Sequence, residues 1–265
     1  MIEVSTLASG SKGNSVLIKS DKTKILIDIG ISVRKLESSL IAHQTTAAEI
    51  DACLLTHEHI DHVRGIKKFC EKYDKPLYGH NYCVNVLKKK HELKTKFQAD
   101  FDEKTFKIGD IIVEPFRISH DSVYAVGYRI ADQTSSLVYA TDMGYCSDLF
   151  YDMAKETDLV LIESNHDVNM LKNCRYPAHV KRRILSNYGH LSNLACASAI
   201  KTLLKGRPRR FVLAHISEEN NLYELAQSET KQSLKLGDVD MQKENIKVFV
   251  ATQNEASGFL RCKDD

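Results

Sequence analysis

The sequence predicts an α/β protein whose architecture is a four-layer αββα sandwich, with two β-sheets packed face to face between outer helices. Three observations support this prediction. Short apolar segments of strand length fall into two groups, one early and one later in the chain. Segments with helical periodicity separate and follow these groups. The 265 residues contain no internal repeat, low-complexity tract or Gly/Pro-rich linker, so we expect one domain spanning residues 1–265.

The first group of strands leads to a short histidine-rich segment. Strands are predicted at residues 2–7, 15–19 and 24–29, with a turn-rich run at 9–14 between the first two. The pattern becomes helical from Ser32, and a buried strand is expected at 52–55, followed by a helix at about 63–73. The histidine-rich segment therefore follows the C-terminal end of a strand.

The second group of strands occupies the later part of the chain. Strands are predicted at residues 104–108, 111–117, 125–130, 136–140 and 158–162, with a helix before the last of them. Helices at about 192–204 and 222–235 flank a further strand at 210–214. These helices are expected to cover the outer face of the second sheet.

Composition excludes several classes of protein. With 37 basic and 35 acidic side chains, the net charge of +2 gives no global attraction for nucleic acid, so any such site must be local. No apolar run approaches the roughly 20 residues of a membrane helix, and no signal peptide is visible. The seven cysteines are scattered and never spaced as CxxC, which argues against a disulfide scaffold and favours a cytoplasmic protein.

The histidine-rich segment is the strongest chemical signal. It reads Thr56-His57-Glu58-His59-Ile60-Asp61-His62 and places three imidazoles and a carboxylate directly after a predicted strand. Imidazole nitrogen and carboxylate oxygen are common ligands of zinc and similar divalent metals. In an extended loop His57 and His59 project to the same side and can share one ion, while Asp61 and His62 turn toward a second.

Further candidate ligands stand at the ends of later apolar runs. They are His120, Asp142 and His215. We assign His57, His59, His120 and Asp142 to one ion, and we assign Asp61, His62, Asp142 and His215 to the other. Asp142 would bridge the two ions. His/Asp sites accept zinc, manganese and iron, so we expect two divalent ions, zinc or manganese, with iron left open.

These residues resemble the metal ligands of the metallo-β-lactamase superfamily in type and in order. In that superfamily an HxHxDH motif is followed by a further histidine, a bridging aspartate and a last histidine. The chain is similar in particular to the YycJ/WalJ family of bacterial metallohydrolases. This closer resemblance rests on three segments, which are Ala8-Ser9-Gly10-Ser11-Lys12-Gly13-Asn14-Ser15, Glu163-Ser164-Asn165-His166-Asp167 and Gly189-His190-Leu191-Ser192-Asn193. The superfamily resemblance implies the same four-layer fold.

The resemblance also implies a substrate class. The family acts on nucleic-acid phosphodiesters, with 5′-exonuclease activity on DNA attributed to it, and its core is similar to those of RNase Z and RNase J. Only about seventy residues separate Asp142 from His215, too few for the extra domain of RNase J. A histidine at position 59 favours hydrolysis over flavodiiron redox chemistry, and the absence of a Cys ligand argues against antibiotic hydrolysis. Because the family's attributed activity is on DNA and the extra RNase J domain is missing, DNA is expected as the substrate more than RNA.

The predicted metal ligands and the residues around them suggest a mechanism and substrate contacts. Two ions about 3.5–4 Å apart lower the pKa of a bridging water, and Asp61 can orient that water and accept its proton. His190 precedes a predicted helix N-terminus, so we expect it to contact a substrate phosphate and assist the leaving oxygen. The other expected substrate contacts are His166, Ser192, Asn193, Ser9 and Ser11. A capped turn at Ser192 and a tight hairpin at Ser9 are the simpler alternatives.

Three basic runs are candidate tracks for a nucleic-acid backbone. They are residues 88–90, 181–183 and 205–210, of which the last two flank the proposed phosphate segment and the strand before His215. A small-molecule hydrolase acting on an ester, thioester or cyclic phosphodiester is the alternative function, because the metal ligands do not distinguish it. A third possible function is that of a non-catalytic protein with a structural metal. The oligomeric state is not predicted.

Overall fold

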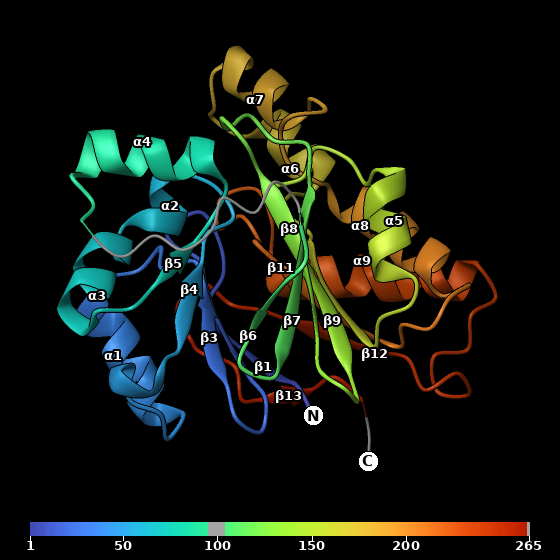
Figure 1. Cartoon of the computed structure of the whole chain (residues 1–265). Coiled ribbons are helices and arrows are strands. Elements are labelled where there is room, and N and C mark those ends of the chain that lie inside the picture. The colour runs from blue at the N-terminus through green and yellow to red at the C-terminus, as the bar shows by residue number, and fades with distance from the viewer. Residues whose placement is uncertain (95–103, 264–265) are drawn as a thin grey trace.

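The computed structural model describes residues 1–94 and 104–263 and confirms the four-layer αββα sandwich (Figure 1). Within these residues, two sheets of six and seven strands pack face to face. Apolar side chains on both faces of each sheet explain this arrangement, because a sheet that is buried on both faces needs a partner on each side.

The first sheet is built mostly from the N-terminal part of the chain. Its strand order is β13-β1-β2-β3-β4-β5. The strands are β1 (Glu3–Ala8), β2 (Ser15–Lys19), β3 (Lys24–Ile27), β4 (Ala52–Leu54), β5 (Leu77–Tyr78) and β13 (Leu260–Arg261). β3, β4 and β5 run parallel, so their carboxyl ends meet at one edge.

The second sheet holds the later strands in the order β12-β11-β10-β9-β8-β7-β6. The strands are β6 (Phe106–Ile108), β7 (Ile111–Arg117), β8 (Val126–Ala131), β9 (Ser136–Ala140), β10 (Leu159–Glu163), β11 (Arg210–Ala214) and β12 (Lys247–Val250). β9 to β12 run parallel in register, for example Leu161 beside Val212. Their carboxyl ends also share an edge.

Helices cover the outer face of each sheet (Figure 1). The first sheet is covered by α1 (Val33–Ala42), α3 (Ile66–Tyr73) and α4 (Asn81–His91), and the second by α5 (Asp148–Ala154), α8 (Asn193–Leu203) and α9 (Tyr223–Leu236). The short helices are α2 (Ile60–Val63), α6 (Val168–Asn173) and α7 (Ala178–Ile184), with a 3₁₀ turn at Ala47–Glu49. No described helix is long and apolar enough to span a membrane.

Three buried apolar clusters correspond to the three interfaces between four layers. One lies between the sheets and includes Val16, Tyr128 and Leu161. A second joins the first sheet to its helices, and a third joins the second sheet to its own. The parallel strands are thereby fixed at both faces, which gives the loops at their carboxyl ends a rigid support.

Two predicted elements differ from those observed. The strand expected at 24–29 ends at Ile27, because Asp28 adopts a left-handed backbone conformation with φ 56°. The helix expected at 63–73 is present as α2 and α3, interrupted where the Gly65 N–H donates to the Ile29 carbonyl at 2.7 Å. Both departures lie beside the histidine segment.

Candidate metal centre

The histidine segment is extended only as far as His59, which is the N-cap residue of α2. Asp61 and His62 therefore lie on a helical turn, whereas we expected them in an extended loop. Asp61 and His62 still reach a group of their own with His215, although the His62 ring also lies beside that of His57, with ring centroids 4.1 Å apart. Gly30 permits the packing of this turn, since a Cβ at Gly30 would lie 1.6 Å from the Asp61 carbonyl oxygen.

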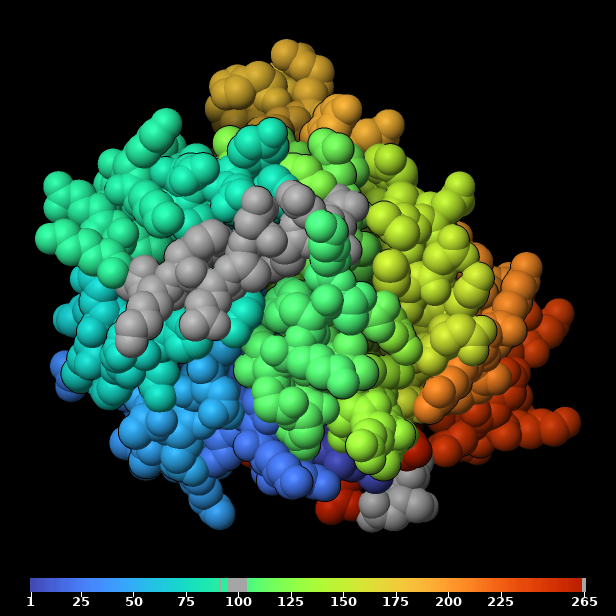
Figure 2. All heavy atoms as spheres, in the orientation of Figure 1, coloured from blue at the N-terminus to red at the C-terminus, as the bar shows by residue number. Residues whose placement is uncertain are grey.

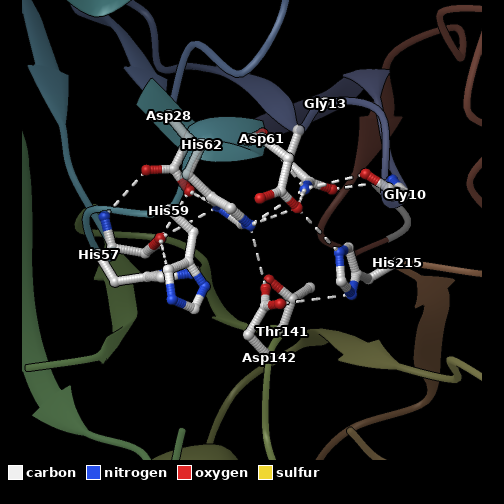
Figure 3. Close-up of polar contacts among 12 residues, drawn as sticks. Gly10, Gly13, Asp28, His57, His59, Asp61, His62, Thr141, Asp142 and His215 are labelled. Atoms are coloured by element: carbon white, nitrogen blue, oxygen red, sulfur yellow. Dashed lines mark hydrogen bonds and ion pairs between the residues drawn. The ribbon is translucent and has the colours of Figure 1, made fainter. Parts of the chain in front are cut away.

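The seven expected ligands fall into overlapping groups of possible metal ligands, two of which share no residue. Figure 3 shows the expected ligands except His120. Each group can offer ligand atoms within 4.8 Å of one another. His57, His59 and His120 form one group, and Asp61, His62 and His215 form the other. His59 Nδ1 lies 3.2 Å from His120 Nε2, and Asp61 Oδ2 lies 3.6 Å from the Nε2 atoms of both His62 and His215.

Asp142 lies between the two groups, at the end of β9. Its Oδ2 is 3.2 Å from His62 Nε2, and its Oδ1 is 3.8 Å from His120 Nε2 and 3.5 Å from His215 Nδ1. Asp142 and His215 have positive φ angles of 61° and 53°, which non-glycine residues seldom adopt. The backbone is thus held in strained conformations that direct both side chains inward.

Unsatisfied buried atoms show that the donor set fits a metal. Within the described part of the chain, His57 Nε2, Asp142 Oδ2 and His215 Nε2 are buried and have no hydrogen-bond partner. Leaving such atoms unpaired costs about 1–3 kcal/mol each, a cost that coordination of a cation would remove. Imidazole and carboxylate donors of this kind suit zinc, manganese or iron.

The pKa shifts of the histidines also fit a site for a cation. Burial, together with the charge of His62, holds the pKa of His57 well below its ordinary value, which favours the neutral ring that binds metals. Burial opposes protonation of His62 and His215, but nearby carboxylates outweigh it and raise both pKa values, that of His215 to about 10. The pocket therefore attracts positive charge.

Asp28 was not among the residues selected from the sequence, yet it fixes the orientation of His62. Its Oδ2 accepts from His62 Nδ1 at 2.7 Å, so His62 Nε2 faces Asp142 (Figure 3). Thr56 supports the same carboxylate through its N–H and hydroxyl. Burial raises the pKa of Asp28, although His62 and Thr56 act against this shift. Its position after an apolar strand is the signal that would have identified it.

Glu163 has the same function on the opposite side and was also missed. It ends β10 and is fully buried. Its Oε1 accepts from the Nδ1 atoms of His190 and His215, each at 2.8 Å, and its Oε2 accepts from two backbone N–H groups. Burial opposes its ionisation, but His190 and His215 lower its pKa to about 2. Glu163 therefore leaves both Nε2 atoms directed away from it.

The contact with Glu163 holds His190 at the edge of the site. Its side chain is 16% exposed and its Nδ1 lies 3.7 Å from Asp142 Oδ1. Ser192 is the N-cap residue of α8 and accepts from the Ala195 N–H, which agrees with the simple capped turn. Asn193 differs from expectation, because its amide is buried and bonded to Ser164 and Asn221. It supports the loops and presents no group to a substrate.

His166 lies beside His190 at the start of α6. Its backbone pairs with Ser192, which fixes the loop after β10 against the turn before α8. Both ring nitrogens are buried and have no hydrogen-bond partner among the described residues. Burial lowers the pKa of His166 to about 4, so the ring is neutral at pH 7. His166 remains a candidate for a substrate contact.

The Ser9–Asn14 loop is a support for the site. Ser9 is buried, and its Oγ accepts from the His215 N–H at 2.8 Å. The N–H groups of Gly10, Lys12 and Gly13 are already bonded within the protein. Ser11 is exposed. The phosphate cradle expected here therefore has few free donors, and Ser9 holds His215 in place.

The fold and this cluster together define a metallohydrolase of the metallo-β-lactamase type. The beta-lactamase superfamily domain matches residues 23–216. Exodeoxyribonuclease WalJ of Streptococcus pneumoniae serotype 2 is 38% identical over 231 residues, which cover 84% of either chain. Exodeoxyribonuclease YycJ of Bacillus anthracis is 36% identical over 238 residues, covering 88% of this chain and 89% of that one.

A solved structure agrees in fold. The metallo-beta-lactamase fold protein YhfI from Bacillus subtilis superposes with a TM-score of 0.73 and 19% identity, covering 97% of this chain and 99% of the other. The chain belongs to the beta-lactamase superfamily and, within it, to the family of the WalJ and YycJ exodeoxyribonucleases. It is a metal-dependent hydrolase, and the resemblance found in its sequence is confirmed.

Proposed function

We propose that this protein is a dinuclear metal-dependent exonuclease that hydrolyses DNA phosphodiesters from 5′ ends. The observation that carries the proposal is the convergence of two ligand groups on Asp142, with three buried ligand atoms that have no hydrogen-bond partner. The relatives named exodeoxyribonucleases support the substrate class, because they align with most of the chain.

The ligands of the two ions would be those expected from the sequence. His57, His59 and His120 would hold one ion, Asp61, His62 and His215 would hold the other, and Asp142 would serve both. When bound, the ions would activate a water for attack on phosphorus and stabilise the charge that develops there. His57 and His62 are fully buried, so the ligands would be shielded from bulk water.

The remaining roles belong to Asp61 and to side chains around the ligand groups. Asp61, whose side chain is 19% exposed, would orient the attacking water and accept its proton. His190 would contact the scissile phosphate and donate a proton from Nε2 to the leaving oxygen, since Glu163 occupies its Nδ1. His166 and Ser11 would be secondary phosphate contacts.

A substrate panel tests the function. Single- and double-stranded DNA and RNA, labelled at either end, would be compared with a generic phosphodiester and a thioester in defined metals. We expect release of labelled mononucleotides from 5′-labelled DNA, with RNA cut more slowly. Hydrolysis of small esters alone would overturn the proposal and favour a small-molecule hydrolase. An Asp61→Asn protein that keeps both metals and all activity would favour a non-catalytic role.

His190 provides a sharper test of the mechanism. Replacement by Gln should lower kcat on DNA at least about 100-fold, because general-acid assistance is lost. The loss should be much smaller on a p-nitrophenyl diester, whose leaving group needs no proton. Metal content measured alongside should stay at the wild-type level. Equal losses on both substrates would contradict the assignment of His190 as the acid.

A further inference from the structure

A strongly basic segment lies next to the metal centre. Residues 172–188, here called the basic arm, contain Lys172, Arg175, Lys181, Arg182 and Arg183 and no Asp or Glu. The whole chain has nearly equal numbers of basic and acidic residues, so this concentration is local. Such a segment attracts a polyanion at short range.

The basic arm contributes little to the core. All seventeen of its residues are described, and none of them is buried. α7, at its centre, projects from the top of the molecule and forms a separate prominence on the surface (Figures 1 and 2). No residue of α7 is more than partly buried, so packing holds this helix weakly and contacts at the ends of the basic arm help to fix its position.

Those contacts connect the basic arm to the metal centre. The Ser119 hydroxyl donates to the Asn187 carbonyl at 2.6 Å, and the Asp121 N–H donates to the Tyr188 carbonyl at 3.0 Å. A Cβ at Gly144, two residues after Asp142, would lie 2.0 Å from the Asn187 oxygen. The end of the basic arm therefore packs against the two loops that carry His120 and Asp142.

A side-chain contact extends this connection. The Arg183 guanidinium bonds to Asp121, whose Oδ1 lies 3.3 Å from His120 Nε2. The Arg183 side chain remains 53% exposed, so it can also face a ligand at the rim of the site. Within the described part of the chain, Arg175 and Arg182 are exposed and have no hydrogen-bond or ion-pair partner.

The other basic runs are less suitable. The run at 205–210 ends at the first residue of β11, whereas His215 follows the last, so the run lies at the opposite end of the strand from the metal centre. Arg207 bonds to Asp158, and Arg209 to backbone carbonyls. The run at 88–90 lies in the last turns of α4, whose other end holds His80 against Tyr124.

Exposed tyrosines favour a single strand as the occupant. Tyr188 is 63% exposed at the junction of the basic arm with the Asp121 loop, and Tyr145 is 46% exposed in the loop after Asp142. Unpaired bases stack on exposed rings, whereas bases inside a duplex cannot. Cations that follow a phosphate backbone, combined with such rings, are typical of single-strand binding surfaces.

We infer that the basic arm is the binding surface for the single-stranded part of the DNA substrate, and that it guides the strand end to the metal centre. This inference rests on the proposed nuclease function. Arg175 and Arg182 contact phosphates, Arg183 contacts the phosphate nearest the site, and Tyr188 stacks on a base.

Binding without cleavage tests the inference directly. Fluorescence anisotropy in a chelator would measure the affinity of the full chain for a 3′-labelled strand of about 20 nucleotides. We compare an Arg175→Glu/Arg182→Glu pair with a Lys205→Glu/Lys231→Glu pair, which changes the net charge equally at exposed positions away from the site. The arm pair should weaken binding at least about tenfold and reduce the salt slope by about 1.4, or two phosphate contacts.

The outcomes separate this inference from the proposed function. Equal weakening by both pairs, or an unchanged salt slope in the arm pair, would overturn the basic arm as the binding surface. So would conversion of an oligomer to a monomer with DNA affinity retained, which would make the basic arm a self-association surface. A wild-type protein that binds DNA through the arm but hydrolyses only small esters would instead overturn the nuclease.

Tyr188 supplies an independent measurement. Tyr188→Ala should weaken strand binding at least about fivefold, whereas Tyr188→Phe should retain it, since stacking needs only the ring. Both variants should bind duplex DNA like the wild type. Equal behaviour of the two variants on the single strand would remove the stacking contact from the inference.

Discussion

Two buried carboxylates determine which nitrogen faces the metal centre in three of its imidazoles. Asp28 accepts from His62 Nδ1, and Glu163 accepts from His190 and His215 through the same atom. A ring held through Nδ1 presents Nε2 in a fixed direction, which reduces the entropy lost when it binds an ion or a phosphate. The chemistry of the ligands therefore depends on residues that would touch neither metal nor substrate.

Replacement of Asp28 by Asn should weaken metal binding about 10- to 100-fold, the usual effect of losing an orienting carboxylate. Isothermal titration with zinc and manganese measures this effect on the purified chain. Asp148→Asn, an exposed change in α5, is the matched control and should leave the affinity unchanged. A normal metal affinity in Asp28→Asn would show that Thr56 and the backbone suffice to orient His62.

Gly30 allows a close approach that no larger residue permits. Gly30→Ala should displace the Asp61 turn, because the added Cβ would overlap the Asp61 carbonyl, and both metal affinity and stability should fall. Gly258→Ala is the control, since a Cβ there meets no atom within 4 Å. Urea unfolding and metal titration of both variants provide the comparison. Wild-type values for Gly30→Ala would mean that the turn can shift without loss.

At the level of elements, every expected ligand follows a strand or a short turn after one. The ends of β4, β9 and β11 were predictable, because each apolar run stops at a His or Asp. Asp28 and Glu163 stand at equivalent ends, but Asp28 was placed inside the strand predicted at 24–29, and Glu163 was named only as part of the segment at 163–167. The sequence pattern marks where a strand ends, but it does not say whether the next carboxylate binds a metal or orients a ligand.

The β8–β9 turn provides a prediction for pH dependence. Asp132 accepts from the N–H groups of Thr134 and Ser135, each at 2.7 Å. Burial opposes ionisation, but these bonds lower its pKa from 3.8 to about 2. A lowered carboxyl pKa stabilises the folded state above about pH 4, and this contribution is lost as the pH falls toward 2.

Asp132→Asn should therefore destabilise the chain at pH 7, and the difference in unfolding free energy from wild type should shrink between pH 4 and 2. Urea unfolding of both proteins in a chelator measures this, because metal loss then affects neither. A difference that is constant or grows on acidification would contradict the assignment of the turn contacts to the ionised carboxylate.

The basic arm shows what the sequence did not reveal. Its helix α7 is short and has no buried residue, and the sequence indicated only the basic run at 181–183 within it. Its position beside His120 results from contacts of Asn187 and Tyr188 with residues about seventy positions earlier in the chain. Contacts of that range are invisible to pattern analysis, which sees only neighbours along the chain.

At the scale of the whole molecule, the metal centre joins the two sheets. His57 to His62 follow β4 of the first sheet, whereas Asp142 and His215 follow β9 and β11 of the second. Apolar runs and alternating apolar residues predicted the strands of both sheets, because burial between the layers requires apolar side chains in each strand. The meeting of their edges was expected because the candidate ligands stand at the ends of apolar runs, and the order of ligands in the family agreed with it.

Removal of metal should therefore lower the stability of the entire fold. Ions present at about 100 times their dissociation constant add about 2.7 kcal/mol to the folded state. For a chain of this length, the melting temperature should drop by roughly 5–10 °C on chelation and recover on addition of zinc or manganese. A melting curve indifferent to metal would show that the sheets need no cation to stay together.

The order of the ligands along the chain has a consequence for biosynthesis. His57, His59 and His120 leave the ribosome long before His215, which is separated from them by β10, the basic arm and α8. A nascent chain can thus form one ligand group while the other is incomplete. A product terminated before His215 would carry the recognisable histidine motif without a complete second ligand group. Under the proposed two-ion function, synthesis itself would then delay nucleolytic activity until most of the protein exists.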